Sequence, residues 1–260
     1  MKKIIVVGYP KSGNTWVTRL VAQLVECPVE GFLYSDHKEP AIEGSERESV
    51  YRVFKSHHQL HEIKKEDVQN AKIIYLLRDP RDVAISGRNY FTTVSGFKSY
   101  RLKEGSTVYR VLKKTYQLYA RVIDKFRLRT EMNKAVLQGN NLIHHWCRVS
   151  WKKHLEPYVK NDSFLTVRYE DLLSNTHNEA KRILHYIGLE KDDNSIRVAI
   201  EKQSFENRKN DFVKKGMKNE AEFLRKGKAQ QWKVELSSEE NQLFVVAFKN
   251  ELEYFGYELY

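Results

Sequence analysis

The chain has 260 residues, of which 41% are hydrophobic, and 45 lysines and arginines against 34 aspartates and glutamates give a formal charge of +11. With 15 tyrosines, 12 phenylalanines and four tryptophans, it has too much apolar surface to remain disordered. Its two distant cysteines, Cys27 and Cys147, exclude a disulfide framework and a zinc cluster, and no run approaches the ~20 apolar residues of a membrane span. We therefore expect one cytoplasmic domain over residues 1–260. The charge favours anionic ligands, although a basic surface that only aids solubility explains it equally well.

The first element in chain order is an apolar run at residues 4–7, which predicts a buried strand. A loop at residues 8–15 follows, and Trp16, Leu20 and Leu24 then repeat at helical spacing. A loop that leads from a strand into a helix presents backbone N–H groups and the positive end of the helix dipole to an anion. We expect the N–H groups of residues 12 to 16 to serve in this way.

The loop itself departs from the usual phosphate-binding pattern. Gly8 and Gly13 keep the glycine spacing, but Asn14 stands where the usual lysine would follow, and the lysine is found earlier, at Lys11. We therefore expect the loop to hold an anion without the usual arrangement of triphosphate and Mg²⁺.

The second strand is predicted at residues 50–54, and Lys55, Ser56, His57 and His58 follow it. A histidine there suits a general base, and a neighbouring lysine can offset negative charge on a reacting oxygen. In a chain with nine histidines, such a pair on its own is more often a surface feature.

The third strand, at residues 73–77, leads into the sequence Arg78-Asp79-Pro80. Proline disfavours helix in the residue before it and can open a helix itself, so a helix that carries Ser86 is expected to start here. Arg78 and Ser86 can then bind one phosphate. The alternative is a surface salt bridge and helix cap.

The remaining segments complete an alternating pattern. Residues 92–141 read as a helical insertion near the acceptor site, residues 164–167 as a fourth strand, and residues 223–227 as a basic turn before Trp232. Short strands that alternate with helices predict a single α/β domain with a parallel β-sheet flanked by helices, a P-loop-like nucleotide-binding fold.

Together these segments resemble the sulfotransferase family that uses 3′-phosphoadenosine 5′-phosphosulfate (PAPS), of the cytosolic and bacterial type. The resemblance runs from about residue 4 to residue 233. It implies a 5′-phosphosulfate loop from Pro10 to Trp16, a base element at residues 55–57, and two 3′-phosphate elements at residues 78–86 and 225–227. The implied catalytic residues are Lys11, Lys55 and His57. The implied cofactor-binding residues are Lys11, Ser12, Gly13, Asn14, Thr15, Trp16, Arg78, Ser86, Tyr169, Ser204, Phe205, Arg225, Lys226 and Gly227.

The resemblance also implies a reaction. A sulfuryl group passes in line from PAPS to a hydroxyl or amine, with His57 as general base, 3′-phosphoadenosine 5′-phosphate (PAP) as product and no metal. The acceptor is a small molecule, lipid or glycan, with no nucleic acid and no membrane span, and the oligomeric state stays open. One departure from the family pattern is that Gln230 and Gln231 precede Trp232.

Two other interpretations compete with this one. A small-molecule or nucleoside kinase fits the glycine spacing of the loop, but it would need a lysine after Gly13 and a strand-end aspartate for Mg²⁺. A non-catalytic nucleic-acid binder fits the charge, but the basic residues are spread along the chain without a recognisable binding motif.

Overall fold

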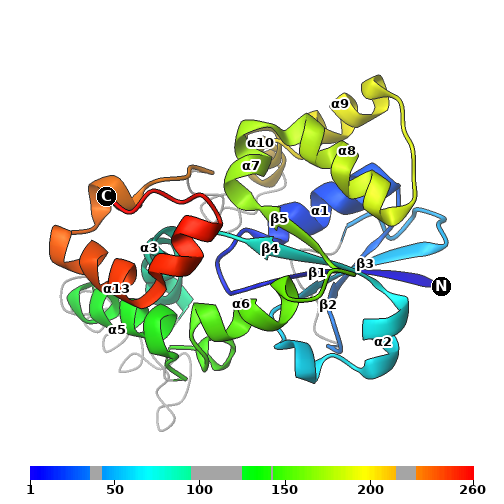
Figure 1. Ribbon diagram of the computed structural model, residues 1–260. Coiled ribbons are helices and arrows are strands. Elements are labelled where there is room, and N and C mark those ends of the chain that lie inside the picture. Colours follow the sequence, from blue (N-terminus) through cyan, green and yellow to red (C-terminus); the bar gives the residue numbers. More distant parts are fainter. Residues whose placement is uncertain (36–42, 95–124, 142, 215–226) are drawn as a thin grey trace, which may run out of the picture. The chain divides into compact units, whose positions relative to one another are not determined.

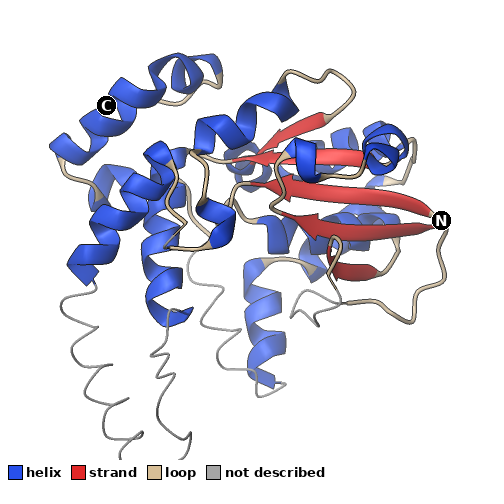
Figure 2. Cartoon of the chain, turned by 90° about the horizontal axis from the view of Figure 1, so that it is seen from below, coloured by secondary structure: helices blue, strands red, loops and turns tan. Residues whose placement is uncertain are grey.

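A parallel five-stranded β-sheet in the order β2-β3-β1-β4-β5 organises the computed structural model. The structure describes residues 1–35, 43–94, 125–141, 143–214 and 227–260. These form two units, Met1–Arg78 with Lys153–Gln230, and Asp79–Lys152 with Gln231–Tyr260. Figure 2 shows the strands of the first unit side by side, with their arrows pointing the same way. The predicted α/β class with a parallel sheet is confirmed, and the extent of the single domain stays a prediction.

The first unit contains the whole sheet. Its strands are β1 (Lys2–Gly8), β2 (Val29–Phe32), β3 (Tyr51–Ser56), β4 (Lys72–Leu77) and β5 (Leu165–Arg168). Its helices are α1 (Asn14–Val25), the 3-10 turn η1 (Leu60–Glu62), α2 (Lys65–Asn70), most of α6 (Trp151–Val159), α7 (Tyr169–Ser174), α8 (Thr176–Ile187), α9 (Asp193–Lys202) and α10 (Phe205–Lys214).

The two faces of the sheet are covered by different helices. Along β1, Ile4 and Val6 point into a core shared with α1, α8 and α9, whereas Ile5 and Val7 alternate to the other face. Figure 1 shows α1 and α8 on one side of the strands and α2 and α6 on the other. All four of these β1 side chains are fully buried, as expected for a parallel sheet with helices on both faces.

Among the strands in the described part of the chain, β2 is the one that was not predicted from the sequence. It has four residues, Val-Glu-Gly-Phe, with Glu30 exposed and Gly31 at a positive φ of 99°. Such a segment lacks the continuous apolar run of the other strands. The segment forms a strand because its backbone pairs in parallel with β3, although the register shifts between Val29 and Gly31.

The second unit is helical. It contains α3 (Pro80–Val94), α5 (Lys125–Gln138), the 3-10 turn η3 (His145–Cys147), α12 (Trp232–Glu235) and α13 (Ser238–Tyr254). Helix α3 begins at Pro80, as predicted from the rigid ring of proline. Helix α5 occupies part of the expected insertion at 92–141, and residues 95–124 of that insertion lie outside the described part. In the part of the chain that the structure describes, no helix combines the length and the apolarity that a bilayer crossing requires.

Candidate functional site

The loop between β1 and α1 forms one wall of the site. Lys11 and Gly13 adopt left-handed conformations, with φ of 76° and 103°, and the turn closes through a 3.1 Å bond from the N–H of Ser12 to the carbonyl of Tyr9. The ladder of α1 starts with bonds from Trp16 and Val17 to the carbonyl of Gly13. The N–H groups of Ser12 and Trp16 thus bond within the loop, and the role of residues 12 to 16 in binding an anion stays a prediction. The N–H groups of residues 14 and 15 are the ones that a helix start leaves without an intrahelical partner.

Two side-chain oxygen atoms of the same loop are buried and have no hydrogen-bond partner among the described residues. The Ser12 side chain is fully buried, and its hydroxyl has no hydrogen-bond partner among the described residues. The same holds for the side-chain oxygen of Asn14, whose amide nitrogen donates to the carbonyl of Ser56 over 3.2 Å. An unsatisfied buried hydroxyl is costly, so its presence beside a helix N-terminus indicates that a ligand completes the loop.

Strand β3 brings Lys55 to the same place. Its ammonium nitrogen lies 3.3 Å from the hydroxyl oxygen of Thr15, in the first turn of α1, and 4.3 Å from the ring centre of Phe32. Because β1 and β3 are parallel neighbours, their carboxyl ends lie at one edge of the sheet. Lys55 therefore joins the loop of Lys11 as a second cation.

His57 follows directly after β3. Its Nδ1 lies 2.7 Å from the carbonyl oxygen of Gly8, the last residue of β1. A carbonyl only accepts, so Nδ1 carries the proton and Nε2 is the lone-pair nitrogen of the neutral ring. Burial lowers the pKa of His57 well below its usual value, and the positive charges of Lys55 and Lys11 lower it further. The imidazole is therefore neutral at pH 7 and has the protonation state of a general base.

His58, the alternative base, makes different contacts. Its Nδ1 lies 2.9 Å from the hydroxyl of Ser56, and its ring packs edge-on against Tyr34. His57, by contrast, is bonded to the backbone of β1.

Arg78 ties the loop to a distant segment. One terminal nitrogen donates to the carbonyl of Lys11 over 3.1 Å and the other to the carbonyl of Lys228 over 3.2 Å. Its guanidinium also lies 4.4 Å from the ring centre of Tyr169. The cationic end of β4 thus lies between the loop and the residue after Gly227.

A cluster of aromatic rings packs around Trp16, in the first turn of α1. Trp16 packs against Tyr169 and Phe205, with ring centres 5.8 and 5.2 Å away, and its indole N–H donates to the carbonyl of Gln203 over 2.9 Å. The backbones of two glycines press on these rings. A Cβ at Gly13 would lie 2.7 Å from Tyr169, and one at Gly227 would lie 2.6 Å from Phe205. Ser204 is next to this cluster and caps the start of α10, where its hydroxyl accepts from the N–H of Asn207 over 3.3 Å.

The predicted site residues fall into three sets. The first unit contains Lys11, Ser12, Gly13, Asn14, Thr15, Trp16, Lys55, His57, Arg78, Tyr169, Ser204, Phe205 and Gly227. Ser86 is on α3 in the second unit, and Arg225 and Lys226 lie outside the described residues.

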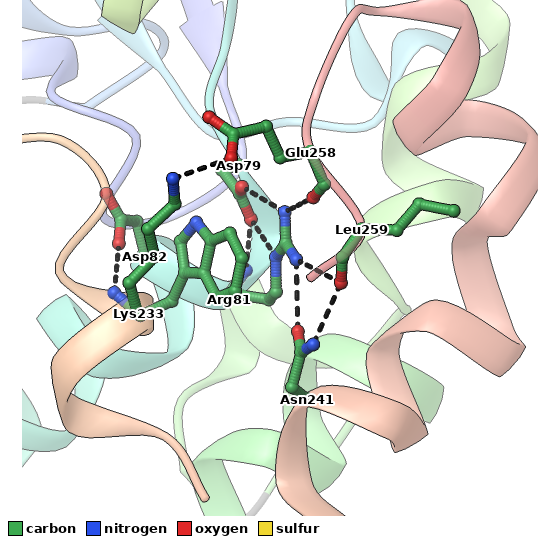
Figure 3. Close-up of polar contacts among 8 residues, drawn as sticks. Asp79, Arg81, Asp82, Lys233, Asn241, Glu258 and Leu259 are labelled. Carbon is green, nitrogen blue, oxygen red and sulfur yellow. Dashed lines mark hydrogen bonds and ion pairs between the residues drawn. The ribbon is translucent and has the colours of Figure 1, made fainter. Parts of the chain in front are cut away.

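The salt bridge after Arg78 is buried, whereas the alternative interpretation placed it at the surface. Arg81 is fully buried, and its guanidinium binds both carboxylate oxygens of Asp79, at 3.0 and 2.8 Å (Figure 3). It also donates to the side chain of Asn241 and to the carbonyls of Glu258 and Leu259. The same carboxylate caps α3, because Oδ1 of Asp79 also accepts from the backbone N–H of Arg81 over 2.9 Å. This pair is therefore a buried structural centre of the second unit.

Known proteins match most of the chain. The family described as Sulfotransferase domain matches residues 1–256. The chain belongs to the sulfotransferase domain family. It is 26% identical to a guinea pig (Cavia porcellus) 3-beta-hydroxysteroid sulfotransferase, over 88% of this chain and 76% of the relative. It is 24% identical to human (Homo sapiens) sulfotransferase 2A1, over 88% and 77%.

Solved structures agree with this family assignment at the level of the fold. Mouse sulfotransferase SULT7A1 complexed with PAP is 19% identical, with a TM-score of 0.67 over 97% of this chain and 85% of the other. A retinol dehydratase in complex with androsterone and PAP is 20% identical, with a TM-score of 0.62 over 97% and 82%. The expected sulfotransferase family and its fold are thereby confirmed.

Proposed function

We propose that this sulfotransferase-family chain transfers a sulfuryl group from PAPS to a hydroxyl of a small molecule. The observation that carries the proposal is the convergence of Lys11, Lys55 and His57 at the carboxyl ends of β1 and β3, beside the loop that holds the buried hydroxyl of Ser12. Cations, a helix N-terminus and a neutral base are the parts that transfer of an anionic group needs.

The donor fits the residues that are present. The orphaned Ser12 hydroxyl and the leading N–H groups of α1 suit the oxygens of a 5′-phosphosulfate, and Trp16, Tyr169, Ser204 and Phe205 suit an adenosine. In this proposal Arg78, Ser86, Arg225, Lys226 and Gly227 hold the 3′-phosphate. When bound, PAPS supplies the sulfuryl group and a phosphate leaving group.

The protein's own residues then have distinct tasks. Lys11 and the start of α1 stabilise negative charge that develops on the leaving phosphate side, and Lys55 stabilises the group in transfer. His57 accepts the proton of the acceptor hydroxyl at Nε2, because its Nδ1 is engaged with Gly8. The lysines take the role that Mg²⁺ has in kinases, so no metal is part of the proposal.

The acceptor class is drawn from the relatives. One relative is named a 3-beta-hydroxysteroid sulfotransferase, and two neighbouring structures hold androsterone or retinol. We therefore place a small alcohol first, ahead of an amine, a lipid or a glycan.

The two cysteines are buried and free, in keeping with a reducing cytoplasmic location.

The first experiment is a thermal shift in EDTA. PAP at a hundredfold excess over its dissociation constant is expected to stabilise the protein by ~3 kcal/mol, whereas ATP has a weaker effect. A larger effect of ATP with Mg²⁺ than of PAP would favour a kinase instead.

The second experiment measures transfer from labelled PAPS to a panel of alcohols, phenols, amines and glycans. Lys11→Ala is expected to lower turnover ~10²-fold or more, because it removes one preorganised charge from the transition state. Turnover that is unchanged in this variant would remove Lys11 from its proposed role.

A further inference from the structure

The segment that carries His57 leaves the sheet at Ser56, so its backbone needs partners outside the strand ladder. Two consecutive carbonyls find them on α6. Nε2 of His154 lies 3.1 Å from the carbonyl oxygen of His57, and the hydroxyl of Tyr158 donates to that of His58 over 2.8 Å. His154 and Tyr158 are four residues apart and therefore lie on one face of the helix.

His154 is buried, with 1% of its surface exposed, and both of its ring nitrogens have partners. Its Nδ1 lies 3.0 Å from the hydroxyl of Tyr75, a fully buried residue of β4. Tyr9 packs edge-on against the imidazole and Tyr158 stacks parallel to it, each with ring centres 5.7 Å away. The ring is thus fixed in position and in rotation.

The direction of the hydrogen bonds follows from chemistry. A carbonyl only accepts, so Nε2 of His154 must donate to His57. In the neutral ring Nδ1 then accepts, and the donor is the hydroxyl of Tyr75. Burial raises the pKa of Tyr75, so that hydroxyl keeps its proton throughout the working pH range. The chain of bonds runs from Tyr75 through His154 to the backbone of His57.

We propose that His154, oriented by Tyr75, is a positioning residue that fixes the backbone of His57 and thereby aims its Nε2 at the acceptor hydroxyl. This inference rests on the proposed function of His57 as the base. His57 is held twice: its ring by the carbonyl of Gly8, and its backbone by His154. A base that must meet a proton within hydrogen-bond reach gains turnover from such fixing, because small misplacements slow transfer strongly.

The surroundings of His57 make this anchor necessary. Lys55 from β3, Lys11 from the loop and His154 from α6 face it, and its ring also packs edge-on against Phe32. Two of these neighbours are cations that repel a protonated imidazole, so charge attraction does not hold the ring in place. The hydrogen bonds with Gly8 and His154 therefore add directed contacts to the packing against Phe32.

Four variants test the proposal. His154→Leu removes the donor, whereas His154→Gln keeps a side-chain N–H that can reach the same carbonyl. Tyr75→Phe removes only the hydroxyl that orients His154. The matched control is Tyr186→Phe, which removes a hydroxyl bonded to the backbone of Ile73, near the other end of the same strand.

The first readout is the ¹⁵N spectrum of histidine-labelled protein, with the His57 signals assigned by comparison with His57→Gln. In the native protein and in Tyr186→Phe, His57 is expected as a single Nδ1–H tautomer. His154→Leu and Tyr75→Phe are expected to give a mixture of tautomers, and His154→Gln to restore the native form. If His154→Leu does not fold, Tyr75→Phe decides, since it deletes a single oxygen atom.

The second readout separates positioning from binding. In His154→Leu, kcat is expected to fall about tenfold, the effect of one lost hydrogen bond, while the KM for PAPS changes less than twofold. His154→Gln is expected to retain most of kcat. Native tautomers in both His154→Leu and Tyr75→Phe would overturn the inference. A native protein that fails to bind PAP would instead overturn the proposed function, and the spectra would still report on the anchor.

Discussion

Nδ1 of His57 lies 2.7 Å from the carbonyl oxygen of Gly8, so the proposed base after β3 is bonded to the last residue of β1. This bond sets the tautomer of the ring, and burial together with Lys55 and Lys11 keeps the ring neutral. The pKa of His57 thus lies well below its usual value of 6.5. In the proposed mechanism, the pH dependence of the reaction follows from this residue.

We expect the acid limb of kcat/KM against pH to lie below pH 6.5. His57 stays unprotonated as the pH falls through 6.5, so activity is lost only when the pH reaches its lowered pKa. The lowered pKa of His57 also affects the free energy of unfolding, because folding disfavours the protonated form of this histidine. An unfolded histidine takes up a proton near pH 6.5 and the folded one does not, so His57 favours unfolding progressively below pH 6.5.

His57→Ala provides the check on this prediction. Turnover is expected to fall ~10²- to 10⁴-fold, whereas the dissociation constant for PAP stays within about twofold. An acid limb that is unchanged in a residual activity of His57→Ala would assign the titration to another group.

Lys55→Met is expected to change both rate and titration. The methionine keeps an apolar stem over Phe32, but the charge near Thr15 is lost, and turnover should fall ~10²- to 10³-fold. Because Lys55 lowers the pKa of His57, the acid limb should also move upward toward pH 6.5. The measurement is the pH profile of kcat/KM in the variant and the native protein.

Lys72→Met is the matched control. Lys72 also lies over an aromatic ring, that of Tyr186, at 4.9 Å, but it stands at the start of β4. It is expected to leave rate and pH profile unchanged. If the acid limb of the kcat/KM profile lies at the same pH in Lys55→Met as in the native protein, the electrostatic effect of Lys55 on His57 is contradicted.

Local patterns were sufficient to predict the loop, the parallel sheet and the start of α3. The loop was visible because Gly8, Gly13 and Lys11 lie within a few residues of each other, between a strand and a helix. Pro80 marked a helix start through its own ring geometry. Each of these features depends on neighbours in sequence, which is why pattern and structure agree.

Features that depend on distant partners could not be predicted. The contact of His154 with His57 joins residues 97 positions apart, and that of Arg81 with Asn241 joins residues 160 apart. A charged residue in a polar turn reads as exposed, because fully buried arginine is rare without several partners. Besides Asp79, the partners of Arg81 are Asn241, Glu258 and Leu259, and no local spacing reveals these three.

Gly13→Ala is expected to abolish PAP binding at concentrations that saturate the native protein. Its φ of 103° is unfavourable for alanine, and the new methyl would lie 2.7 Å from the ring of Tyr169. The loop, Tyr169 or both must therefore move. Gly188→Ala is the control, because Gly188 has a similar φ of 88° with nothing within 4 Å of the added methyl.

The two glycine variants share a backbone penalty of ~1 kcal/mol, so their stabilities against urea should differ by the clash alone. Calorimetric titration with PAP then separates a local effect on the loop from a general loss of stability. PAP binding that is equal in the two variants would show that the contact of the loop with Tyr169 has no part in the site.

Arg81→Met is expected to destabilise the protein by about 3–5 kcal/mol, because the buried carboxylate of Asp79 loses its charged partner. The double variant Asp79→Asn with Arg81→Met should recover part of this loss, since no charge is then left buried without compensation. Arg182→Met serves as the control, because its pair with Glu179 is exposed and such pairs contribute less than about 1 kcal/mol. The midpoint of urea unfolding is measured for all three variants.

Arg81 also binds the carbonyls of Glu258 and Leu259, so removal of residues 258–260 should lower the midpoint in the native background more than in Arg81→Met. Equal effects of the truncation in both backgrounds would mean that Arg81 does not hold the end of the chain.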